Sequence, residues 1–99
     1  MAACPLSPET RKRVELMFPP EEWPEASRLL EERCGNNLPM LDKFDELHLE
    51  RFRFAALKVS KGTIEGLQQA VQLTNIDWRD LLVAAGFANG VNDHESWLP

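Results

Sequence analysis

Tyrosine is absent from this sequence of 99 residues, and cysteine occurs only twice, at Cys4 and Cys34. Neither cysteine belongs to a Cys-x-x-Cys pair, and a disulfide framework takes about four cysteines or more, so we expect two free thiols in a reducing compartment. No stretch approaches the roughly 20 apolar residues of a membrane span. The first residues also lack the basic segment and apolar run of a signal peptide. We therefore expect a cytoplasmic protein that has no membrane partner.

Residues that favour β-strands are scarce as well. Valine, isoleucine and threonine are few, and no segment alternates between apolar and polar residues in the way of a half-buried strand. The apolar share of 43% and the charged share of 27% are ordinary for a globular protein. The length suits one domain. The sequence therefore predicts a single all-α domain over residues 1–99, with more loosely structured ends at 1–6 and 88–99.

Positive charge is in short supply, because 11 lysines and arginines face 16 acidic residues, a net charge of −5. The imbalance is local. Residues 1–50 hold 6 basic and 11 acidic side chains, whereas residues 51–99 hold 5 of each. An acidic surface argues against general binding to phosphate backbones, so we expect no nucleic-acid partner. A partner attracted by charge would meet the N-terminal half and would present a basic surface.

Capping residues, prolines and glycines predict five short helices. Ser7 and Pro8 suit the start of the first helix, and the paired prolines at 19–20 end it. Gly86 and Phe87 form the pattern of a Schellman end after the last helix. The expected helices run from Pro8 to about Phe18, from near Glu21 to Cys34, over about 42–60, from Thr63 to Leu73, and from Asp77 to Ala85.

The third of these segments is the longest and carries apolar residues on more than one side. Phe44, Leu49, Phe52 and Ala56 lie within one wide stripe, and Phe54 lies outside it. A helix of this kind is usually buried on several sides. We therefore expect a compact, non-parallel array of about five short helices, with the helix over about 42–60 at the centre and no sheet.

Few residues are candidates for catalysis or metal binding. Asp45 and His48 can meet on one helix face, with Arg51 nearby, but a metal site needs three or four ligands, and an apolar stripe more often holds a histidine that is satisfied locally. Cys34 lies at a helix C-terminus, where the dipole disfavours a thiolate. No glycine-rich phosphate loop occurs. We therefore expect no enzyme, no metal, no cofactor and no catalytic residue.

The fourth and fifth expected helices, joined by a turn at residues 74–76, resemble a helix-turn-helix in outline. The second helix of such a pair must enter the major groove. Here residues 77–80 carry two acids and one arginine, which would repel phosphates. The basic triplet at residues 11–13 is more typical of a solvated helix face. A DNA-associated regulator is therefore the alternative function, behind a protein-interaction module.

The junction of the first two helices is the candidate partner surface. A short connection there brings an off-face leucine and a tryptophan near a helix start into one neighbourhood with several acids. An apolar anchor ringed by charge is the usual composition of an interface hot spot. We expect a protein partner or a second copy of the chain to bind at this surface, which consists of Leu16, Glu21, Glu22, Trp23 and Glu25. Segments such as residues 6–13 and 77–87 resemble those of small bacterial proteins, and this likeness implies no activity.

Overall fold

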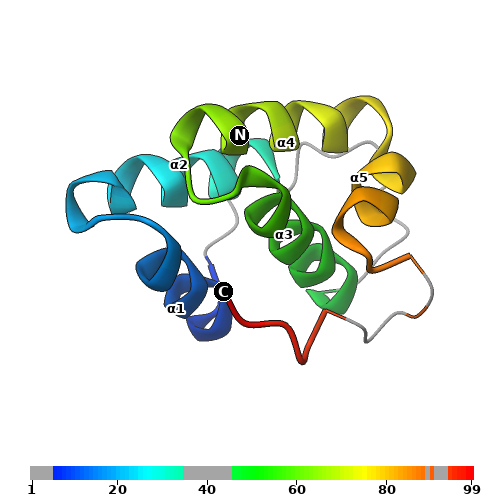
Figure 1. Cartoon of the computed structure of the whole chain (residues 1–99), viewed down its shortest axis with the longest axis horizontal. Helices are drawn as coiled ribbons and strands as arrows, with labels where there is room; N and C mark the ends of the chain where they lie inside the picture. Colours follow the sequence, from blue (N-terminus) through cyan, green and yellow to red (C-terminus); the bar gives the residue numbers. More distant parts are fainter. Residues whose placement is uncertain (1–5, 35–45, 89, 91–93) are drawn as a thin grey trace.

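The computed structural model describes residues 6–34, 46–88, 90 and 94–99, and for residues 46–49 it describes the backbone only. Within these ranges the chain is helical and contains no strand, which confirms the predicted fold class. Figure 1 shows the helices packed at steep angles to one another. They are α1 (Pro8–Met17), the short 3-10 helix η1 (Pro20–Glu22), α2 (Trp23–Arg33), α3 (Glu46–Ser60), α4 (Ile64–Ile76) and α5 (Trp78–Ala85).

The first helix starts and ends where the sequence predicts. The Ser7 hydroxyl accepts a hydrogen bond from the Thr10 amide at 3.2 Å, and Pro8 occupies the first helical position. The helix stops at Phe18, whose backbone is extended, because the two prolines that follow cannot continue it. After them the chain makes the turn η1 and only then enters α2, so the α-helix begins at Trp23, slightly later than the predicted start near Glu21.

The end of α5 is a Schellman motif, as predicted. Gly86 adopts the left-handed conformation with φ of 78°, which disfavours a residue with a Cβ atom. The Phe87 amide donates to the Leu82 carbonyl oxygen at 2.9 Å, and the Phe87 side chain is buried.

The predicted break at residues 74–76 is wrong, because α4 continues through Ile76. The Thr74 hydroxyl donates to the Ala70 carbonyl oxygen at 2.9 Å, and the Asn75 amide nitrogen donates to the Val71 carbonyl oxygen at 2.8 Å. Both side chains thus bond within the helix, one turn back, and do not open it. Asn75 also donates to the Arg33 carbonyl oxygen at 2.9 Å, which ties α4 to the end of α2. Asp77 alone separates α4 from α5.

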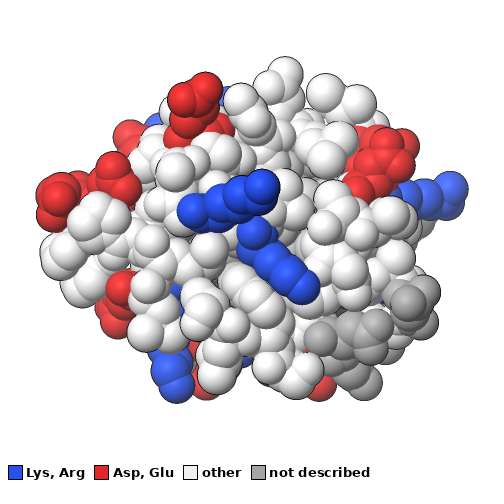
Figure 2. All heavy atoms as spheres, viewed as in Figure 1, with Lys and Arg blue, Asp and Glu red and all other residues white. Residues whose placement is uncertain are grey.

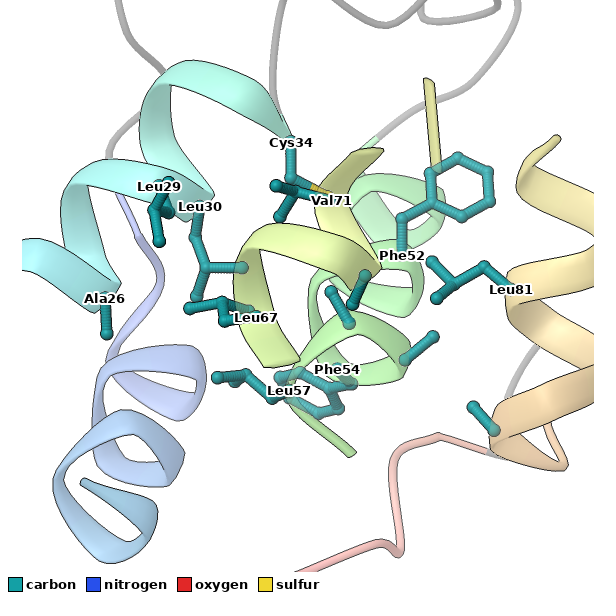
Figure 3. Packing of buried hydrophobic residues seen from close by; sticks show 14 of the residues in the cluster. Ala26, Leu29, Leu30, Cys34, Phe52, Phe54, Leu57, Leu67, Val71 and Leu81 are labelled. Atoms are coloured by element: carbon teal, nitrogen blue, oxygen red, sulfur yellow. The ribbon is translucent and has the colours of Figure 1, made fainter. Parts of the chain in front are cut away.

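The central position of α3 is confirmed. It packs against α1, α4 and α5, while α2 covers α4 (Figure 1). Every residue from Arg51 to Leu57 is buried, so the helix is enclosed on all sides over this stretch. Figure 3 shows Phe52 facing Leu81 of α5 and Leu57 near Leu67 of α4. Phe54 is buried even though it lies outside the predicted stripe. The predicted start of this helix, at about residue 42, lies outside the described residues.

Beyond α5, residues 94–96 form a turn that the Trp97 amide closes by donating to the His94 carbonyl oxygen at 3.1 Å. His94 is buried between the rings of Phe54 and Phe87, with centroid distances of 5.2 and 6.3 Å. The chain then runs back beside α1 (Figure 1). No helix in the described part of the chain is both long enough and apolar enough to cross a bilayer.

Candidate functional site

The candidate surface lies at the corner where α1 gives way to α2, and we call residues 15–25 the α1–α2 corner. Its backbone is closed by a hydrogen bond from the Glu22 amide to the Pro19 carbonyl oxygen at 2.9 Å. The indole Nε1–H of Trp23 donates to the Phe18 carbonyl oxygen at 2.7 Å, across the two prolines. The side chain of Trp23 therefore holds both ends of the connection and is itself held in one orientation.

The predicted site residues at this corner differ in exposure. Leu16 is 58% exposed, so it points away from the core that Val14 and Phe18 enter on the same helix. Glu21 is exposed, whereas Glu22 is partly buried. Trp23 is partly buried and packs against the core.

The fifth predicted residue, Glu25, is engaged elsewhere. Arg28 forms an ion pair with Glu25 and a second one with Glu32 at 3.6 Å, both along α2. The hydrogen bond from Arg28 to Glu25 raises the pKa of the guanidinium. Glu25 is thus largely neutralised within its own helix. In contrast, Glu21 and Glu22 make no ion pair with any residue in the described ranges.

Sequence reasoning missed part of this surface. Pro19 and Pro20 are exposed, and Glu15 is exposed one residue before Leu16. A signal for them was present in the sequence, since no lysine, arginine or histidine occurs between Arg13 and Arg28, whereas four glutamates do. Figure 2 shows acidic side chains gathered at the left edge of the molecule, where Figure 1 places the α1–α2 corner.

The other two tryptophans have ring partners. Trp78, partly buried on α5, packs against Phe52 with ring centroids 5.6 Å apart, and the Arg79 guanidinium lies 5.2 Å from its centroid. Trp97 lies 6.2 Å from Phe54 and 6.2 Å from Phe87. Trp23 has neither a cation nor a second ring stacked on it among the residues that the structure describes.

Of the basic triplet at residues 11–13, Arg11 and Lys12 lie on the solvated face that the sequence indicated, but Arg13 does not. Arg13 is only 3% exposed. Its guanidinium lies 4.1 Å from the centroid of the Phe54 ring and donates to the carbonyl oxygens of Glu9 and Trp97, at 2.8 and 3.0 Å. Packing on an aromatic ring and the hydrogen bonds from Nε and Nη1 explain why this charge tolerates burial.

Among the residues considered for catalysis, those whose side chains are described have structural roles. Arg51 is buried and donates to the Phe87 carbonyl oxygen at 2.5 Å, just beyond the end of α5. The side chains of Asp45 and His48 lie outside the described residues. Cys34 is fully buried, and desolvation raises the pKa of its thiol to about 12, so the nucleophilic thiolate is disfavoured. Within the described ranges, no three residues among histidine, cysteine and the acids cluster to hold a metal.

The predicted helix-turn-helix is not formed as expected, because α4 extends to Ile76. The turn of such a motif has three or four residues, whereas one residue separates α4 from α5. Ile76 and Val83 are exposed here, but the charged residues between them are of both signs, namely the acids Asp77 and Asp80 and the base Arg79. This surface thus lacks the one-sided charge of the α1–α2 corner.

No protein-family model matches this chain, and its comparison with curated proteins and with solved structures gives no significant match.

Proposed function

We propose that this protein is a small, non-catalytic interaction module that docks a protein partner through the α1–α2 corner. The observation that carries the proposal is the exposed Leu16 in a segment whose only charged side chains, from residue 14 to residue 27, are carboxylates. A single exposed leucine needs no explanation. Here it is accompanied by the exposed Pro19 and Pro20 and by the partly exposed Trp23.

The rigidity of the corner supports a docking role. Association is weakened by the entropy lost when flexible side chains become ordered. At this corner the prolines restrict the backbone, and the hydrogen bond to Phe18 holds the Trp23 ring before any partner arrives. Interface hot spots are rich in aromatic anchors with charge at the rim, and a tryptophan that is already held in place suits that role.

The test compares two matched surface substitutions. Leu16→Asp places a charge inside the proposed surface, and Ile76→Asp places the same charge on an isoleucine of α4 that is also exposed, at 74% against 58% for Leu16. Partners are recovered by cross-linking from the native host with wild type and with each variant, after circular dichroism shows that both variants are folded. We expect Leu16→Asp to lose a protein that wild type and Ile76→Asp both retain. Loss with Ile76→Asp alone would move the docking surface to α4, and recovery of no protein by wild type would contradict the proposal.

A further inference from the structure

Aromatic rings in this protein repeatedly carry a cation. Arg13 lies over Phe54, and the Lys58 ammonium lies 4.9 Å from the centroid of the Phe87 ring. Arg79 lies over Trp78. Trp23 is partly exposed and lacks such a cation among the described residues. Residues 14–27, which include this ring, contain no lysine, arginine or histidine of their own.

The charges around Trp23 favour a cation from outside. The face of an indole ring is negative and attracts ammonium and guanidinium groups. Glu21 and Glu22 immediately precede this ring and are not neutralised by an ion pair within the described structure. The ring and the carboxylates therefore attract the same kind of group.

We propose that the α1–α2 corner is a receptor for an arginine side chain of the partner, which stacks on Trp23 and pairs with Glu21 and Glu22. This rests on the proposed function and specifies its partner: a basic segment of another protein that carries an apolar residue beside the arginine. Arginine is favoured over lysine because its planar guanidinium both stacks on an indole and pairs with a carboxylate in a fork. A second copy joined corner to corner would place carboxylates opposite carboxylates, which disfavours a symmetric dimer here.

The experiment uses three short fluorescein-labelled peptides that differ only in the residue placed at two positions. Each contains two leucines and either two arginines, two lysines or two citrullines, since citrulline keeps the shape of arginine without its charge. Binding to the full chain is followed by fluorescence anisotropy at low salt, and the indole N–H signal of Trp23 is followed by NMR. We expect the arginine peptide to bind best, the citrulline peptide to bind about tenfold more weakly or worse, and the Trp23 signal to shift.

Two double variants separate the site from general charge. Glu21→Gln with Glu22→Gln removes two charges from the corner, whereas Glu65→Gln with Glu95→Gln removes two exposed charges elsewhere. We expect the first pair to weaken binding of the arginine peptide about tenfold and the second to change it less than about twofold. Trp23→Leu, which keeps an apolar side chain, should also weaken binding. If Trp23→Leu does not fold, the glutamate pair still decides the outcome.

Several results would overturn the inference. Equal binding of the arginine and citrulline peptides would show that the positive charge is not recognised. Equal losses of affinity in the two pairs of glutamate variants would show that the peptide is held by non-specific attraction. Absence of binding by all three peptides, combined with a partner that depends on Leu16, would reject arginine recognition while the docking function stands. If no peptide binds and no partner depends on Leu16, the docking function and the arginine recognition are both rejected.

Discussion

At the scale of single residues, buried cations are a recurring feature of this acidic protein. Arg53 donates from Nε to the Cys34 carbonyl oxygen at 3.0 Å, at the end of α2, and Arg51 bonds a carbonyl oxygen just past α5. The Arg53 guanidinium thus lies at the negative end of the α2 dipole, where an unpaired carbonyl oxygen needs a donor, and Arg51 satisfies a carbonyl oxygen in the segment after α5. Sequence periodicity cannot reveal such positions, because it assigns every charged residue to the exposed face.

Cys34 offers a test at the same scale. Its complete burial predicts that the thiol does not react with a disulfide reagent at about pH 8 while the protein is folded. The measurement uses a Cys4→Ser variant, so that one thiol is counted, and compares native protein with protein in denaturant. Rapid reaction of one thiol in the native protein would contradict the burial of Cys34.

The same thiol predicts a dependence of stability on pH. Its pKa rises from 9.0 to about 12 on folding, so the folded state binds the proton more tightly than the unfolded state does. This contribution is complete below pH 9, and the free energy of unfolding falls as the pH rises from 9 to about 12. Denaturation of the wild type and of Cys34→Ala over this range should show a difference that shrinks with rising pH.

At the scale of elements, Asp77 holds together two helices that no loop separates. Its carboxylate accepts from the amides of Arg79 and Asp80 at 3.1 and 3.4 Å, and its own amide donates to the Leu73 carbonyl oxygen at 2.7 Å. We expect Asp77→Ala to lower the free energy of unfolding by about 1 kcal/mol, since the cap at the start of α5 is lost. Asp77→Asn keeps a capping oxygen and should lose much less, and equal losses in the two variants would assign the effect to charge. Urea denaturation measures both.

The helix ends show what local chemistry predicts well. Ser7, Asp77 and Gly86 act where their capping preferences indicated, because these preferences depend on a few neighbouring atoms. The end of α4 was mispredicted for the opposite reason. Threonine and asparagine usually interrupt helices by competing for backbone groups, but here Thr74 is buried and Asn75 reaches α2, so tertiary contacts determine the outcome.

At the scale of the whole molecule, the all-α class and the central α3 could be predicted because strand-forming residues are few and one helix is apolar on several sides. For the candidate site, the exposure of Leu16 followed from helical periodicity. The neutralisation of Glu25 by Arg28 was visible as spacing along α2. The orientation of Trp23 was not predictable, because it depends on a bond to the carbonyl oxygen of Phe18 across a non-helical turn.

The distribution of charge over the molecule predicts that duplex DNA is not a ligand. The net charge is −5, and three of the eight arginines and lysines in residues 11–13 and 51–99 are buried, namely Arg13, Arg51 and Arg53. A fluorescence anisotropy titration at low salt should show no binding. Micromolar affinity that weakens by a factor of about 10³ between 50 and 200 mM salt would contradict this prediction and favour a regulator of DNA.

The hydrogen bond between Arg13 and the Trp97 carbonyl oxygen joins residues that are 84 positions apart in the chain. During synthesis on the ribosome, α1 is made early, but the acceptor that helps to bury its arginine is made after all five helices. Until residue 97 emerges, the Arg13 guanidinium lacks one of its acceptors, and the Phe54 ring lacks its contact with Trp97. The docking of α1 therefore reaches its final form only after translation has passed this residue.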